Sequence, residues 1–167
     1  MVESIHKNFQ MGTIQWMSFP RKNVLDAIQR IASDDFFDAI EISHFANDDE
    51  RRRAKEMLEQ AHMRVCFGAQ PMLLGSGLNP NDLDEDGRLR AEVLISAVDE
   101  AEYLGARGIA FLAGKWTEEH KAEHYAQLLK TTRAVCAHAA KKGMIVEMEV
   151  FDYDMDKAAL IGPAPLA

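Results

Sequence analysis

Hydrophobic and polar positions alternate in five short stretches of the chain, and segments with helical spacing lie between them. The stretches that predict strands are residues 13–19, 37–43, 63–69, 108–114 and 144–151. Apolar residues recur every three or four positions in the segments that predict helices, which are 24–32, 47–62, 88–104 and 117–142. Regular alternation of this kind indicates parallel strands with helices packed outside them.

No linker divides the chain, so residues 1–167 are expected to form a single domain. Residues 1–12 precede the first strand and are expected to be an N-terminal tail. Residues 70–87 are rich in Gly, Pro, Asn and Asp, which predicts a long loop. A further helix is expected to begin near Asp156.

The last predicted strand has two different faces, because alternate side chains of a strand point in opposite directions. One face is apolar and consists of Val146, Met148 and Val150. The other carries Glu147 and Glu149, and Glu41 has a similar place in the strand 37–43. In an open sheet with helices on both sides, such carboxylates would be buried without partners. In a closed β/α barrel they would face the interior, whose C-terminal mouth holds the chemistry, so the pattern favours a barrel.

The net charge of -8 and the pI of about 5.2 limit the partners that this chain can have. Nucleic acids and anionic membrane surfaces are normally bound by basic faces, so neither is expected as a partner. The sequence shows no apolar run typical of a signal peptide or a membrane span. Cys66 and Cys136 are expected to be reduced, buried thiols, and the protein is predicted to be cytoplasmic.

Three segments resemble one family of enzymes. "EVFDYDMDKAALIGP" (149–163) is similar to the fifth-strand segment of the sugar phosphate isomerase/epimerase proteins. "AEYLGARGIAFLAG" (101–114) resembles their junction of helix three and strand four, and "FDAIEIS" (37–43) resembles their second strand. These proteins are xylose isomerase-like TIM barrels, a superfamily that also holds hydroxypyruvate isomerase, inosose dehydratase and endonuclease IV. The resemblance implies the first five β/α units of an eight-unit TIM barrel.

The resemblance also implies a divalent metal at the barrel mouth, held in the family by a Glu from strand five and by an Asp, a His and a Glu from later strands. Glu149 matches the first of these ligands. Carboxylate and imidazole ligands together suit Mn²⁺, Mg²⁺, Co²⁺ or Zn²⁺, which would polarise a substrate carbonyl. Glu41 and Glu149 are therefore expected to be the catalytic carboxylates, and Glu149 the metal ligand.

Four further residues follow or end predicted strands, where β/α barrels place their binding loops. They are expected to contact a small sugar or sugar phosphate, and they are Trp16, His44, Gln70 and Lys115.

Two other features are expected to be structural. Glu147 lies deeper than Glu149 and is expected to form an ion pair. His120 and His124 match the zinc-binding spacing H-x-x-E-H of some metalloproteases, but an exposed helix surface is expected.

The chain of 167 residues is shorter than the roughly 250 that a barrel of this type needs, so its sheet edges are expected to be open. Three interpretations follow. The first is a truncated isomerase or epimerase of small sugars, sugar phosphates or related hydroxy-carbonyl compounds, weak or inactive alone. The second is a non-catalytic partial barrel that binds a partner or forms a homo-oligomer through its open edges. The third is a metal-dependent phosphodiester hydrolase like endonuclease IV, which the acidic charge disfavours.

Overall fold

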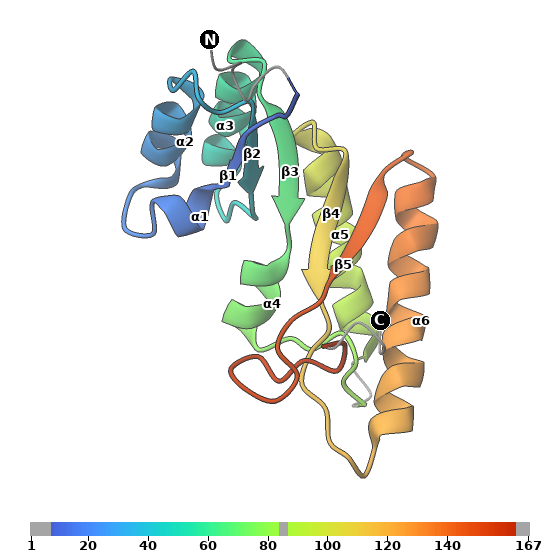
Figure 1. The fold of residues 1–167 in the computed structure, drawn as a ribbon. Coiled ribbons are helices and arrows are strands. Elements are labelled where there is room, and N and C mark those ends of the chain that lie inside the picture. The colour runs from blue at the N-terminus through green and yellow to red at the C-terminus, as the bar shows by residue number, and fades with distance from the viewer. Residues whose placement is uncertain (1–7, 84–86, 163–167) are drawn as a thin grey trace.

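The five predicted strands form one parallel sheet in the order β1-β2-β3-β4-β5 (Figure 1). The structure is a computed structural model that describes residues 8–83 and 87–162. The strands are β1 (Gly12–Ile14), β2 (Ala39–Ile42), β3 (Arg64–Gly68), β4 (Gly108–Leu112) and β5 (Ile145–Glu149). The expected series of β/α units is therefore confirmed.

The helices connect successive strands and follow the predicted pattern closely. They are α1 (Gln15–Ser18), α2 (Val24–Ala32), α3 (Asp48–Gln60), α4 (Gln70–Ser76), α5 (Gly87–Tyr103) and α6 (Lys121–Ala140). The side chains of Asn23 and Asn47 accept hydrogen bonds from the first-turn N–H groups of α2 and α3. Among the described residues, no helix has both the length and the apolar character needed to cross a membrane.

Three local expectations were wrong. The first strand ends at Ile14, and α1 follows where the strand was expected to continue. The expected loop 70–87 contains α4, because Pro71 suits the first turn of a helix and Gly77 takes the left-handed conformation (φ 70°) that ends it. The segment after Asp156 shows bends instead of a helix up to residue 162. Most of the expected tail, residues 1–7, lies outside the described part.

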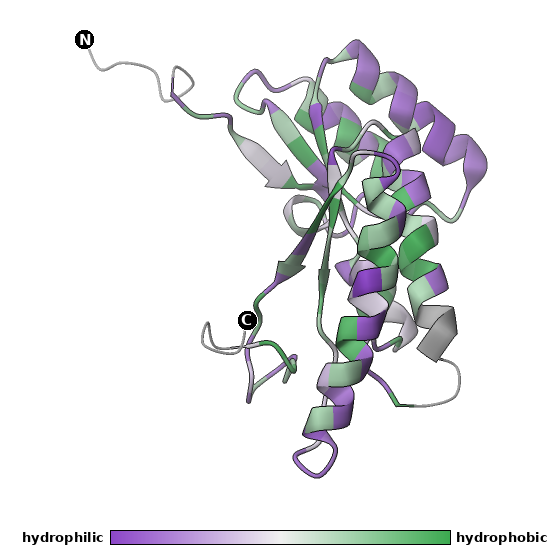
Figure 2. Cartoon of the chain, turned by 90° about the vertical axis from the view of Figure 1, so that its right-hand side faces the viewer, coloured by the Kyte–Doolittle hydropathy of each residue, from purple (hydrophilic) through white to green (hydrophobic). Residues whose placement is uncertain are grey.

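The core lies between one face of the sheet and the helices. Helices α3, α5 and α6 lie on the same side of the sheet (Figure 2), and their buried residues include Leu58, Leu94 and Val135. The fully buried strand residues on this side are Ile40, Ile42, Phe67, Ile109 and Phe111. The opposite, inner side of the described strands carries Glu41, Cys66, Glu147 and Glu149. Period-two alternation has therefore placed the carboxylates on the face away from the helices, as a barrel requires.

The pairing between β3 and β4 is the shortest in the middle of the sheet. It joins Phe67 to Ile109 and Gly68 to Ala110, whereas β4 and β5 are paired along all of Gly108–Leu112. On the helix side, Lys55 of α3 donates a hydrogen bond to the carbonyl of Tyr103 across this seam (2.7 Å). The outer layer therefore joins the two halves of the sheet where the strands themselves separate.

Candidate active site

Three carboxylates occupy the inner face of the sheet. Glu41 lies on β2, and Glu147 and Glu149 lie on β5, where they pair in register with Ala110 and Leu112 of β4. No ion pair joins any of the three to a cation within the described residues. The ion pair expected for Glu147 was therefore wrong for this part of the chain, because its side chain is exposed on the open inner face and needs no buried partner.

The surroundings of Glu41 disfavour its charged form. Burial raises the pKa of Glu41, and the negative charges of Glu149 and Glu147 raise that pKa further. Carboxylates from β2 and β5, more than a hundred residues apart in sequence, therefore lie on the same face of the sheet and near enough for their charges to act on Glu41. Two carboxylates of unlike surroundings on one surface are a common arrangement for proton transfer.

Gly68 ends β3 at the point where three of the predicted site residues meet. A Cβ atom on Gly68 would lie 2.5 Å from the carboxylate oxygen Oε1 of Glu41, from Oε1 of Gln70 and from the ring carbon Cη2 of Trp16. An acid, an amide and an indole ring therefore already crowd the position that a side chain at residue 68 would take. The structure thus brings Trp16, Glu41 and Gln70 together.

Several polar atoms near Gly68 have no hydrogen-bond partner. Glu41 Oε1, Gln70 Oε1 and Ser43 Oγ are all buried, and none accepts or donates a hydrogen bond in the described structure. Gln70 as a whole is only 7% exposed. Buried polar atoms are normally paired, so this cluster is a place where a ligand could supply the missing partners.

His44 is held toward the helix layer. Its Nδ1 lies 2.6 Å from Oε2 of Glu100 on α5, and the other oxygen of Glu100 accepts the backbone N–H of Phe45 (3.0 Å). The side chain of Glu100 is 6% exposed and that of His44 is 46% exposed. This contact leaves Nε2 of His44 as the ring nitrogen available to another group. Contact between His44 and a substrate stays a prediction.

Lys115 lies on a loop that is fixed through its backbone. Its carbonyl accepts hydrogen bonds from the side chains of Asn79 (2.8 Å) and Asn81 (2.7 Å), and Asn81 also accepts the N–H of Gly114 (2.6 Å). The Lys115 side chain itself is exposed, so its predicted contact with a substrate also stays a prediction.

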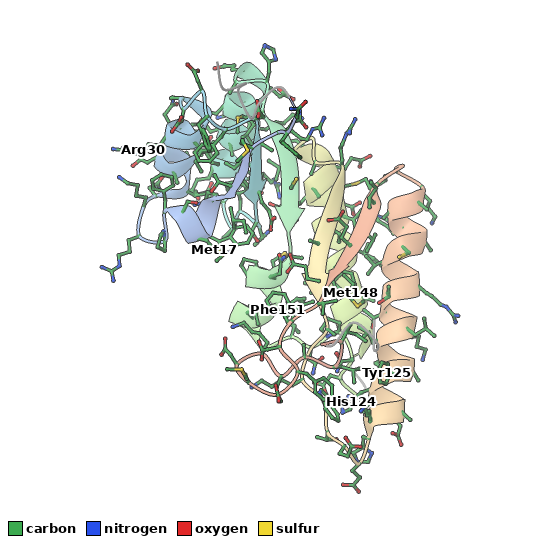
Figure 3. The ribbon with its side chains drawn as sticks, viewed as in Figure 1. Met17, Arg30, His124, Tyr125, Met148 and Phe151 are labelled. Atoms are coloured by element: carbon green, nitrogen blue, oxygen red, sulfur yellow. The ribbon has the colours of Figure 1, made fainter. Side chains whose placement is uncertain are left out.

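His124 of the H-x-x-E-H segment belongs to the same loop assembly. Its Nδ1 lies 2.7 Å from the carbonyl oxygen of Asn81, and the residue is 7% exposed. Figure 3 shows it on the side of α6 that faces the loops. The expected exposed surface was therefore wrong for His124, because the segment around Asn81 packs over it, whereas His120 is exposed as expected.

The segment after β5 folds back across the end of β4. Asp152 accepts the backbone N–H groups of Lys157 (2.8 Å) and Ala158 (3.0 Å), and these bonds hold the pKa of Asp152 below its usual range. Ala159 forms an antiparallel bridge with Lys115. Tyr153 accepts a hydrogen bond from Lys121 (2.8 Å), so this segment is tied to both β4 and α6.

The two cysteines are exposed, contrary to expectation. Cys66 shares the inner face with Glu41, its register partner on β2. Partial burial raises the pKa of the Cys66 thiol, and the charges of Glu41 and Glu147 raise it further. Burial was expected from its apolar neighbours in sequence, but alternation along β3 directs Val65 and Phe67 to the core and Cys66 to the opposite face.

The described residues supply only part of a metal site. No group of three or more His, Cys, Asp or Glu side chains is placed to hold a metal ion in residues 8–83 and 87–162. The oxygen donors of Glu149 and Glu41 do suit a hard divalent cation, and their shared face would bring them to one. The carboxylate oxygens of the described residues are therefore the kind of ligand that a divalent metal prefers, but they are too few to form a complete site.

Comparison with known protein families identifies the family of this chain. Residues 28–158 match the model of the xylose isomerase-like TIM barrel family. The chain belongs to this family. The comparison with curated proteins found no match.

Solved structures of this fold are similar over most of the chain. A D-tagatose 3-epimerase-like protein is 18% identical with a TM-score of 0.73, covering 86% of this chain and 53% of its own. An AP endonuclease of family 2 from Brucella melitensis is 15% identical with a TM-score of 0.75, covering 92% and 60%. A xylose isomerase-like TIM barrel protein from Mycobacterium smegmatis, in complex with magnesium, is 11% identical with a TM-score of 0.52, covering 77% and 46%. The chain thus spans about half to three-fifths of these proteins.

Sequence reasoning missed two residues that shape the site. Gly68 was not considered, although a glycine at the end of a strand often marks a close approach of other groups. Glu100 was not considered either, and its contact with His44 spans 56 positions. Only the first of these had a local signal in the sequence.

Proposed function

We propose that this chain forms the first five β/α units of a divalent-metal-dependent isomerase or epimerase of small sugars, sugar phosphates or related hydroxy-carbonyl compounds. The observation that carries this proposal is the common inner face of Glu41 and Glu149, which are close enough for one charge to raise the pKa of the other. Membership of the family and the likeness to a D-tagatose 3-epimerase-like protein support the proposal.

The two carboxylates have different proposed roles. Glu41 is half-buried, and its raised pKa suits a group that takes a proton from a carbon next to a carbonyl and returns it. Glu149 ends β5 and would hold the metal, with further ligands from outside the described residues. The metal, when bound, would polarise the carbonyl oxygen of the substrate. The neighbour in complex with magnesium supports this choice of cofactor.

Calorimetric titration with MnCl₂, MgCl₂, CoCl₂ and ZnCl₂ tests the role of Glu149. We expect the variant Glu149→Gln to bind metal at least ~10-fold more weakly than the unchanged chain, because one charged ligand is lost. Glu56→Gln makes the same change on the exposed surface of α3 and serves as the control. Equal affinity in the unchanged chain and in Glu149→Gln would remove Glu149 from the site.

Assays of ketohexose interconversion test the activity itself. We expect turnover by this chain to be weak, because the metal ligands among the described residues are too few. Turnover that persists unchanged in Glu41→Gln would contradict the proposed proton transfer by Glu41.

Self-association of a partial barrel is a second candidate function. The supporting observation is the apolar surface at the edge strand β5, where Ile145 is 58% exposed and the following Val150 is 52% exposed. Open edges with apolar side chains favour pairing with another chain. Light scattering tests this: a defined oligomer that Ile145→Lys dissociates would support it, and a monomer at all concentrations would exclude it.

Phosphodiester hydrolysis has less support. One neighbour is named an AP endonuclease. However, the net charge of -8 and the acidic inner face would repel a polyphosphate backbone. We therefore expect no cleavage of abasic DNA in the presence of any of the four metals.

A further inference from the structure

A cavity of about 460 Å³ opens at the end of the sheet where the parallel strands begin (Figure 1). Its lining comes from residues just before β2, from the start of β3 and from residues just before β4. The cavity therefore lies at the opposite end of the strands from Gln70 and Glu149, which follow or end β3 and β5. A volume of this size is typical of sites that bind small molecules.

The charged side chains of this cavity favour an anionic occupant. Three basic residues line it, and they are His62, Arg64 and Arg107. Neither guanidinium group forms an ion pair or a hydrogen bond with another described residue. Asp38 is the one acid among the described residues of the lining, and its Oδ2 accepts the backbone N–H of Met11 (2.9 Å). The lining is therefore basic, although the whole chain has a net charge of -8.

His62 occupies a backbone position that normally favours glycine. It follows the C-cap of α3 with a φ of 53°, in the left-handed region. Glycines take this region after α4, α5 and α6, at Gly77, Gly105 and Gly143. A histidine is strained at such a position, and a binding role for its imidazole in the cavity would explain why it stands there.

We propose that this cavity binds a small organic phosphate, at a site separate from the candidate active site. Arginine side chains bind phosphate oxygens through paired N–H donors, and an imidazole N–H can add a further donor. The partly buried side chains of Phe37 and Met63 line the same cavity and offer an apolar surface to the organic part of the ligand. The inference does not depend on the proposed function.

The two arginines lie at the starts of neighbouring strands that are not paired there. Arg64 begins β3 and Arg107 directly precedes β4, whereas the register pairing of these strands starts only at Phe67 and Ile109. A phosphate group bound by both arginines links the two strand ends. Occupancy should therefore slow deuterium exchange at the backbone amides of 64–66 and 107–109.

Calorimetric titration in a phosphate-free buffer of low ionic strength tests the site. The probes are phenyl phosphate, inorganic phosphate and the neutral compound phenol. We expect saturable binding of phenyl phosphate and no saturable binding of phenol, because the guanidinium groups need an anion. Inorganic phosphate should bind at least ~10-fold more weakly than phenyl phosphate, because it has no apolar part to bury.

Five variants locate the binding site. Arg64→Gln and Arg107→Gln each remove one guanidinium group and should weaken the binding of phenyl phosphate at least ~10-fold. Arg53→Gln makes the same change on the exposed surface of α3, and Lys115→Gln removes an exposed cation at the opposite end of the strands. Both controls should leave the affinity unchanged. His62→Gly should weaken binding without lowering the melting temperature, because glycine is unstrained at this φ.

Each outcome either supports or overturns the proposed site. No saturable binding of phenyl phosphate would overturn it, as would an unchanged affinity in Arg64→Gln or in Arg107→Gln when circular dichroism shows that the fold is kept. Inorganic phosphate that binds as tightly as phenyl phosphate would replace the organic ligand by the free ion. A loss of binding in Lys115→Gln alone would move the anion to the other end of the strands. All of these results leave the metal titration and the turnover assays of the proposed function unaffected.

Discussion

The two faces of the sheet differ in the burial of their side chains and in the hydrogen bonding of their polar groups. On the helix side, Phe67 and Phe111 are buried among other apolar side chains, at 1% and 0% exposure. On the inner side, one residue away along β3, lie the exposed Cys66 and Gly68, which the side chains of Glu41, Gln70 and Trp16 approach closely. Three of the four buried side-chain oxygens without a hydrogen-bond partner in the described residues, those of Glu41, Ser43 and Gln70, belong to the inner side, and the fourth, Thr132 Oγ1, lies on α6. We therefore expect stability to depend mainly on the helix-covered face of these strands and the proposed chemistry to depend on the inner face.

The largest loss in the free energy of unfolding should come from a substitution on the helix side of the sheet. Phe67→Ala removes a buried ring and leaves a cavity, which should lower the free energy of unfolding by about 3–5 kcal/mol. Cys66→Ala, one position away on the inner side, should change it by less than about 1 kcal/mol. Urea denaturation of both variants measures the difference. Similar losses in the two would contradict the assignment of stability to one face.

The next effect tests the loop assembly that borders the inner side. Asn81→Ala removes two side-chain hydrogen bonds from a fully buried residue: the N–H of Gly114 loses its acceptor, and the carbonyl of Lys115 keeps only the bond from Asn79. We expect a loss of about 2–3 kcal/mol in urea denaturation. Asn79→Ala removes its bond to the same Lys115 carbonyl and its bond from the N–H of Asn81, and it should cost less because Asn79 is only partly buried. A loss in Asn81→Ala no greater than that in Asn79→Ala would show that Asn81 does not organise the loop.

A smaller change, and a gain of stability instead of a loss, is expected from a substitution on the inner side. The pKa of Glu41 is raised in the folded chain. The contribution of Glu41 to stability is therefore complete at pH values below the ordinary pKa of glutamate, and it is lost as the pH rises through the raised pKa. At neutral pH the ionised group is therefore destabilising, and Glu41→Gln should raise the melting temperature by roughly 2–4 °C.

Melting curves at several pH values check this expectation. The gain from Glu41→Gln should shrink as the pH falls toward the ordinary range of glutamate. Glu56→Gln, on the exposed surface of α3, is the control and should show no such gain. A loss of stability in Glu41→Gln at neutral pH would mean that the carboxylate has a stabilising partner.

The smallest effect concerns the segment after β5. The backbone N–H groups of Ala158 and Lys157 lower the pKa of Asp152. The stabilisation that these hydrogen bonds give is therefore present at pH values above the ordinary pKa of aspartate, and it is lost as the pH falls through the lowered pKa. Asp152→Ala should increase proteolysis within 153–158 at neutral pH and leave global melting nearly unchanged. Asp156→Ala, in the same segment, should have less effect. Equal cleavage in both variants would dismiss the role of Asp152.

Most of the fold could be predicted from alternation and spacing. Strands β2 to β5 and helices α2, α3, α5 and α6 follow patterns that repeat over many residues, which averages out local exceptions. Helix α4 was missed because its seven residues contain Gly and Pro, and these residues are as typical of loops as of helix ends. Short elements depend on one or two residues, so their sequence signal is weak.

The candidate site was predictable only in part. The place of Glu41, Gln70 and Trp16 at strand ends was visible in the sequence, and the structure brings these three together at Gly68. The partner of His44 was not visible, because Glu100 lies on a helix far along the chain. Residues that depend on tertiary contacts of this kind carry no local pattern that would identify them.

The brief pairing of β3 with β4 has a mechanical consequence. Since Phe67 and Gly68 are the only β3 residues paired in register with β4, we expect the line between these two strands to be the weakest in the described sheet (Figure 1). The contacts of His44 and Lys55 with α5 then act as tethers across that line. Deuterium exchange should accordingly proceed in two separate blocks, β1–β3 and β4–β5, and cutting the tethers should hasten exchange at the backbone amides along the seam.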